Sequence, residues 1–165
     1  MRYLEAKEDG EGHYDDVNSA VFSPDGKLLA SDSNGDLKIV NPANGQVTSV
    51  GNYQNGLLSA GDLSAVANGT MYGTSPTKPG GGDASASNVL IVVNTQTGAA
   101  TAVGPTGYAD VWGLAYSNAH VIGFTTAGQI LQIDPQTGAT TVLATKNIAF
   151  WGAGQSPLVD GNPCN

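Results

Sequence analysis

Two tryptophans stand in matching sequence contexts and are the residues best suited to binding chemistry. Trp112 lies in the run Asp110-Val-Trp-Gly, and Trp151 lies in the run Phe150-Trp-Gly. The face of an indole ring can stack on a sugar ring, a peptide or a cation. The same two residues could instead be core side chains between neighbouring structural units. If residues visible in the sequence bind a ligand, we expect these tryptophans to be the anchors.

Three polar residues hold related positions and complete the candidate ligand-binding set. Asp16 and Asp110 are equivalent in the repeat described below, and Asn18 occupies in the first unit the place that Trp112 has in the third. The candidate ligand-binding residues are therefore Trp112, Trp151, Asp110, Asp16 and Asn18. All of them flank the start of the first strand of a unit, so the fold must bring those strand ends to one place.

The sequence contains no catalytic, metal or cofactor motif, so we expect no catalytic residue, no bound metal and no cofactor. The two histidines, His13 and His120, have no cysteine partner that would complete a zinc site. Residues 32–36 begin like a calcium loop, but Leu37 stands where such a loop needs glycine, which favours a hairpin turn. Neither a nucleophile elbow nor a phosphate-binding loop is present. We therefore predict that the protein is not an enzyme.

The composition argues against several classes of partner. The 165 residues include 14 acidic and 6 basic side chains, which gives a net charge of −8. This acidity, without a basic stripe, argues against nucleic-acid binding and against anionic membranes. No apolar run is long enough to span a bilayer, and the single Cys164 cannot form an internal disulfide. The low proportion of charged residues, 12%, and the many Gly, Ser, Thr and Asn residues favour an extracellular location.

A repeated turn organises the chain. The turns at 41–45, 94–98 and 134–138 each end in glycine and begin 53 and then 40 residues apart. A short apolar run precedes each turn, and a run rich in Thr and Val follows it. A period near forty with several short strands per unit is typical of propeller blades. We therefore predict an all-β, propeller-type protein whose blades each have four antiparallel strands.

The repeat predicts about three blades plus one extra strand. An acidic N-terminal arm over residues 1–11 precedes a single repeat domain over residues 12–165, with units at about 12–57, 58–107 and 108–147 and a partial unit at 148–165. The third unit is the clearest, with strands expected at 111–116, 121–125, 129–133 and 140–144. The second unit contains an insertion, 75–87, with the composition of a flexible linker. The extra strand is expected near residues 149–154.

The first unit resembles a WD repeat. Residues 12–31 begin with Gly-His and contain Phe-Ser-Pro-Asp-Gly at 22–26, which in that family open the repeat and link its first two strands. The resemblance implies a propeller blade and structural roles for His13 and Ser31. Val40 and Asn41 stand where the family has Trp-Asp, so the family's hydrogen-bond network would lack its tryptophan. The later units are similar to bacterial β-propeller repeats with Asp-x-x-Thr-Gly turns.

About three blades and a strand leave two unsatisfied surfaces, because closed propellers typically have about four to eight blades. The chain could be a piece of a longer propeller, or several copies could complete a ring or grow as a filament. A third arrangement pairs the run that starts at Tyr3 with the run that starts at Phe150. Tyr3 and Phe150 are therefore the candidate assembly residues, and a homo-oligomer is expected.

These features favour a non-enzymatic binding scaffold that presents propeller loops and a channel mouth to a protein partner. One alternative is a self-assembling structural subunit, which would form a ring or filament through its exposed blade surfaces. Another is a lectin-like module that binds carbohydrate through the Trp and Asp positions. An enzyme fragment whose active site needs further blades is the remaining alternative.

Overall fold

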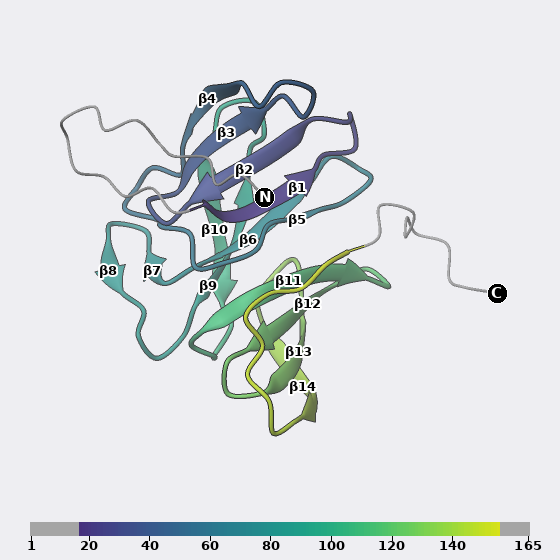
Figure 1. Cartoon of the computed structure of the whole chain (residues 1–165). Coiled ribbons are helices and arrows are strands. Elements are labelled where there is room, and N and C mark those ends of the chain that lie inside the picture. The colour runs from purple at the N-terminus through teal and green to yellow at the C-terminus, as the bar shows by residue number, and fades with distance from the viewer. Residues whose placement is uncertain (1–16, 156–165) are drawn as a thin grey trace.

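The computed structural model describes residues 17–155, which form three four-stranded antiparallel sheets (Figure 1). Blade 1 has the strand order β1 (Val17–Phe22), β2 (Leu28–Asp32), β3 (Asp36–Val40) and β4 (Val47–Asn52). Blade 2 has the order β5 (Ser64–Ala65), β6 (Met71–Ser75), β9 (Val89–Val93) and β10 (Ala100–Pro105). Blade 3 has the order β11 (Val111–Ser117), β12 (His120–Thr125), β13 (Gln129–Ile133) and β14 (Thr140–Thr145). The predicted all-β, propeller-type architecture is confirmed.

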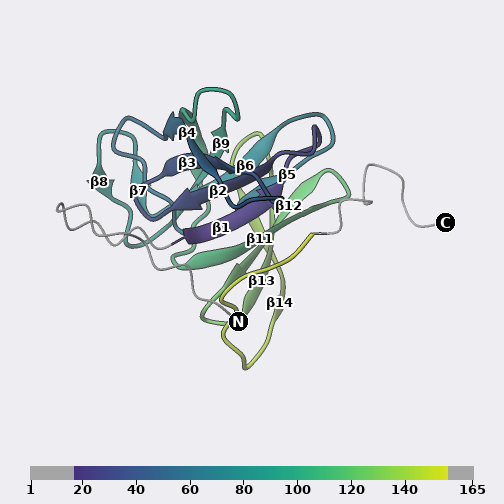
Figure 2. The same cartoon turned by 45° about the horizontal axis from the view of Figure 1, so that its top comes forward.

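The first strands of the three blades lie side by side. Strand β5 contacts both β1 and β11 (Figure 2). The first strands β1, β5 and β11 are thereby brought to one region. The fourth strand of each blade lies at the opposite edge of its sheet. In residues 17–155 the structure has no helix that is long and apolar enough to cross a membrane.

Strand β9 supplies the cores on both faces of blade 2. Ile91 is fully buried in the core shared with blade 1, and its neighbour Leu90 is fully buried in the core shared with blade 3. The sequence of β9, Val-Leu-Ile-Val-Val, therefore has no polar alternation. A strand that is covered on both faces reads as a continuous apolar run. Blade 2 is thus sandwiched between two separate apolar cores.

The turn glycines join the blades through main-chain contacts. Gly98, in the repeated turn of blade 2, lies against Gly51 of β4, and Gly138, in the turn of blade 3, lies against Gly104 of β10. A Cβ atom at Gly51 or Gly104 would stand 2.0 or 2.1 Å from the carbonyl oxygen of the threonine that precedes the facing turn glycine. The repeated turn therefore reverses the chain and also sets the spacing between blades.

Blade 3 departs from this pattern at the matching position. The residue six places after the turn glycine is Gly51 in blade 1, Gly104 in blade 2 and Ala144 in blade 3. Each of the three pairs with the second residue of its neighbouring strand, β3, β9 or β13. On blade 3 a methyl group therefore occupies the place where, on the other two blades, a neighbouring turn docks.

The extra strand predicted near residues 149–154 is not formed. Residues 149–155 carry no strand and run beside β11 (Figure 1). Their main-chain groups bond to isolated partners, such as Phe150 N–H to the Thr125 carbonyl at 3.2 Å, and not to a ladder. Glycines at 152 and 154 also disfavour a strand. The arrangement that pairs Tyr3 with this segment involves residues outside the described range.

The insertion predicted to be a flexible linker contains a short hairpin instead. Strands β7 (Thr77–Lys78) and β8 (Gly82–Asp83) pair antiparallel. The hairpin docks on the connection between blades 1 and 2, where the Thr77 hydroxyl donates to the Gly56 carbonyl at 2.6 Å and Gly80 N–H donates to the Asn55 carbonyl at 2.5 Å. These tertiary hydrogen bonds give order to a segment whose composition alone favours flexibility.

Candidate functional site

The two tryptophans predicted as ligand anchors contact each other. Trp112 lies on β11 and Trp151 lies in the segment 149–155; their ring centroids are 6.0 Å apart and their planes are tilted by 58°. Trp112 is half-buried, whereas the Trp151 side chain is 71% exposed. The alternative that both are core residues therefore does not describe Trp151. The pair presents an aromatic surface to solvent.

The other predicted ligand residues do not all gather around this pair. Asp110 is exposed, lies two residues before Trp112, and has a left-handed φ of 53°. Asn18 lies on β1 and is half-buried, and its amide donates to the Ser59 carbonyl at 3.3 Å. The Asn18 amide is therefore bonded to the connection between blades 1 and 2. Asp16 lies outside the described residues.

Phe150, a predicted assembly residue, packs within the chain. Its ring meets the ring of Phe124 edge to face, with centroids 5.3 Å apart. Phe124 alternates along β12 with the buried Val121 and Thr125, so it lies on the face of blade 3 that points away from blade 2. Phe150 therefore covers part of that face from within the same chain. Tyr3, the other predicted assembly residue, lies outside the described residues.

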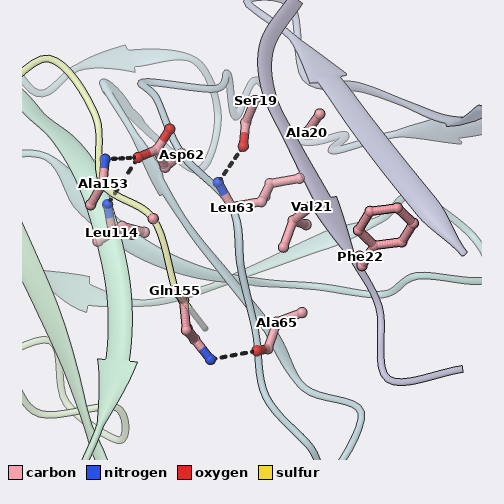
Figure 3. Close-up of a pocket in the computed structure, with 11 residues that line it drawn as sticks. Ser19, Ala20, Val21, Phe22, Asp62, Leu63, Ala65, Leu114, Ala153 and Gln155 are labelled. Carbon is pink, nitrogen blue, oxygen red and sulfur yellow. Dashed lines mark hydrogen bonds between the residues drawn. The ribbon is translucent and has the colours of Figure 1, made fainter. Parts of the chain in front are cut away.

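Asp62, which the sequence analysis did not select, links the segments that carry the two tryptophans. Its N–H donates to the Trp112 carbonyl at 2.8 Å. Its Oδ2 atom accepts the N–H of Ala153 at 2.5 Å and the N–H of Leu114 at 3.4 Å (Figure 3). Burial raises the pKa of Asp62 above its ordinary value, and the two N–H donors oppose that rise. One side chain thus fastens residues 149–155 to β11.

Gln155 makes a second fastening a few residues further on. Its Oε1 atom accepts the Ser64 hydroxyl at 2.6 Å and the Tyr116 N–H at 2.9 Å, and its Nε2 atom donates to the Ala65 carbonyl at 3.1 Å. A side-chain amide can serve main-chain donors and acceptors in this way because it carries both kinds of group. Residues 149–155 are therefore held against blades 2 and 3 at several points.

A pocket opens where the first strands of the three blades meet (Figure 3). Its volume is about 240 Å³, and it is lined by residues 19–22 of blade 1, by Asp62, Leu63, Ala65 and Leu114, and by residues 153–155. Among the described residues that line it, Asp62 is the one ionisable side chain, and most of the remaining wall is apolar. Among residues 17–155, no group of three or more His, Cys, Asp or Glu side chains is placed to hold a metal ion.

Substitutions at Asp62 should separate its charge from its hydrogen bonds. Asp62→Ala leaves the N–H groups of Leu114 and Ala153 without their acceptor and should lower the free energy of unfolding by about 1–3 kcal/mol. Asp62→Asn keeps an acceptor oxygen, so its effect should be smaller. Because the pKa of Asp62 is raised in the folded state, the native protein binds this proton more tightly than the unfolded chain. The contribution of Asp62 to stability should therefore fall as pH rises from the ordinary Asp value through the raised folded value.

Urea denaturation of the wild type and Asp62→Asn from about pH 3 to 7 checks this expectation. The asparagine variant should gain stability relative to the wild type as pH rises through that window. If the free energies of unfolding of the two proteins change with pH in parallel, ionisation of Asp62 does not destabilise the folded state.

The sequence matches no protein-family model and no curated protein. Solved structures share its fold. A protein of unknown function from Bacteroides thetaiotaomicron aligns with a TM-score of 0.56 at 12% identity, over 81% of this chain and 32% of that one. An oligogalacturonate lyase in complex with manganese aligns with a TM-score of 0.52 at 17% identity, over 82% and 42%. The computationally designed Ika8 protein aligns with a TM-score of 0.52 at 18% identity, over 86% and 41%. At these identities the likeness shows the propeller-type fold alone, and this chain spans less than half the length of each.

Proposed function

We propose that this protein is a non-enzymatic binding scaffold that engages a protein partner through Trp112 and Trp151. The observation that carries the proposal is the exposure of Trp151, 71%, beside a half-buried Trp112. Tryptophan is among the residues most enriched at the energetic centres of protein interfaces. An exposed indole held against a second indole offers a partner a large apolar contact.

The fastening of residues 149–155 supports the same proposal. Asp62 holds Ala153, two residues after Trp151, and Gln155 holds the end of the segment. A segment that is ordered before it binds loses less conformational freedom when the partner arrives. Most of the conformational entropy of the segment that carries Trp151 is therefore lost when the chain folds and not when the partner binds.

The repeat types fit a scaffold as well. We infer that blade 1 is a WD-like blade, because Phe-Ser-Pro-Asp-Gly at 22–26 lies at the link between β1 and β2, where the resemblance requires it. We infer that blades 2 and 3 are of the bacterial type with Asp-x-x-Thr-Gly turns. In both types the turn residues serve the blades, which leaves the loops for recognition.

Trp151→Ala should weaken binding of the partner by about thirtyfold or more, since truncating a central interface tryptophan removes about 2 kcal/mol or more. Immobilised wild type, Trp112→Ala, Trp151→Ala and Leu143→Ala would be exposed to a lysate, and each retained protein purified and titrated by calorimetry. Leu143, 53% exposed on β14, is the matched control for loss of an exposed apolar side chain. A partner that binds Trp151→Ala as tightly as Leu143→Ala would refute the role of the pair.

Exposed apolar side chains favour a second candidate, a self-assembling subunit. Blade 1 exposes Val17 (68%), Phe22 (55%) and Val47 (56%). Ala144 argues against repetition of the joint between blades from one copy to the next, because its methyl group stands where the next turn would dock. Light scattering over a concentration series, run on the same four proteins, distinguishes the two functions. A fixed oligomer or open-ended growth that survives Trp151→Ala would favour assembly.

The exposed indole could also stack on a sugar ring, so the lectin-like alternative needs its own test. Tryptophan fluorescence across a sugar panel is the direct assay, because Trp151 lies at the proposed contact. Saturable quenching by one sugar class, lost in Trp151→Ala, would replace the protein partner by a carbohydrate.

A further inference from the structure

The pocket beside the tryptophan pair contains an uncompensated carboxylate. Among residues 17–155, no Lys, Arg or His lines it, and both N–H groups that reach Asp62 bond to the same oxygen, Oδ2 (Figure 3). Within residues 17–155, no hydrogen bond or ion pair reaches the other oxygen, Oδ1. A half-buried carboxylate that lacks a counter-charge has lost part of its hydration, and the two N–H donors at Oδ2 replace only part of that loss. A cation that enters the pocket would restore that loss.

The donor set fits an organic cation better than a metal ion. Calcium and magnesium take several oxygen ligands, whereas this pocket offers one carboxylate. Much of the wall near Asp62 is aliphatic and includes Val21, Leu63 and Leu114 (Figure 3). Such a wall suits an alkyl stem. The net charge of −8 draws cations toward the protein at long range.

The size of the pocket further limits which ligands could fit. Its volume of about 240 Å³ lies below the range of about 300–1,000 Å³ that is typical of sites for drug-sized molecules. One extended side chain fits such a space better than a whole sugar or nucleotide. We propose that the pocket binds an alkylammonium or alkylguanidinium group, with the cation at Oδ1 of Asp62 and the alkyl stem along Val21 and Leu63. This site goes beyond the proposed function and would stand if the tryptophan pair bound nothing.

Amide NMR tests the proposal directly, because the N–H groups of Leu114 and Ala153 report on the Asp62 carboxylate. The probes are n-butylammonium, N-acetyl-lysine amide and N-acetyl-arginine amide, with n-butanol and butyrate as neutral and anionic controls. The cations should give saturable shifts at both amides, and the two controls should not. Tighter binding of the amino-acid amides than of butylammonium would assign the site to a side chain of a protein partner. The reverse order would assign it to a free amine.

Asp62→Asn should weaken cation binding at least tenfold, whereas Asp83→Asn, which neutralises an exposed carboxylate outside the lining, and Leu143→Ala should leave it unchanged. In the wild type, binding should weaken on acidification as Asp62 takes up its proton, since the described lining contains no other carboxyl group. This wild-type titration tests the role of the Asp62 carboxylate in cation binding even if Asp62→Asn does not fold. Equal shifts with butanol and butylammonium, no saturable shift at either amide, or binding that does not change on acidification would overturn the proposal.

Discussion

Gly104→Ala should lower the free energy of unfolding by about 3 kcal/mol and loosen blade 3 from blade 2. The added Cβ atom would stand 2.1 Å from the carbonyl oxygen of Thr137 and 3.1 Å from the carbon of that carbonyl. These are main-chain atoms, so no side chain can rotate away and the blades themselves must move apart. Overpacking at such a contact costs about 1–3 kcal/mol and occasionally more. Gly104 does not have a left-handed φ, so the cost comes from the contact and not from backbone strain.

Urea denaturation measures this effect, and two variants serve as controls. Gly45 is the turn glycine of blade 1; its φ is 73° and nothing lies within 4 Å of its added Cβ. Gly45→Ala should therefore cost only about 1 kcal/mol, from backbone strain. Ala144→Gly makes the reverse change at the matching position of blade 3 and should cost less still. If Gly104→Ala is as stable as Gly45→Ala, the glycine contact does not set the spacing between blades.

Leu90→Ala and Ile91→Ala should each lower the free energy of unfolding by about 2–5 kcal/mol, because each removes a fully buried aliphatic side chain. The two neighbours act on different cores. Ile91 packs with Leu29 and Leu37 of blade 1, and Leu90 packs with Leu131 of blade 3. Each cavity should therefore weaken a different junction between blades.

Hydrogen exchange would locate the two losses. Leu90→Ala should accelerate exchange chiefly in β12 and β13, and Ile91→Ala chiefly in β2 and β3. Leu143→Ala, at an exposed position, should change stability by less than about 0.5 kcal/mol. Identical exchange patterns in the two core variants would show that the three blades open as one unit.

The strands could be predicted because the turns between them depend on local chemistry. The Asn94 side chain accepts the N–H of Gln96 and of Thr97, and the Asp134 side chain accepts the N–H of Gln136, all within the same turn. Blade 3 was predicted to within one residue at each strand end. The insertion predicted at 75–87 corresponds to the segment between β6 and β9, the second and third strands of blade 2.

Tertiary contacts decided what the sequence analysis missed. Asp62 and Ala153 are 91 residues apart, and neither stands in a pattern that suggests the hydrogen bond between them. The same hydrogen bond, together with those of Gln155, holds residues 149–155 beside β11. The sequence analysis instead expects an extra strand near residues 149–154. The pairing of Trp112 and Trp151 follows from that placement. An acidic residue just before a first strand, as at Asp16 and Asp110, is the signal that could have drawn attention to Asp62.

Ala144 also has a consequence for anyone who would extend this protein by engineering. A copy of blade 2 or blade 3 grafted after residue 145 would bring its own turn to β14, as the earlier turns come to β4 and β10. The alanine methyl would then meet a main-chain carbonyl at a separation that atoms do not tolerate. Extension therefore requires Ala144→Gly, and a glycine at the matching position of every added blade that carries a further blade. Residues 149–155 must also be removed from the surface that the added blade would cover.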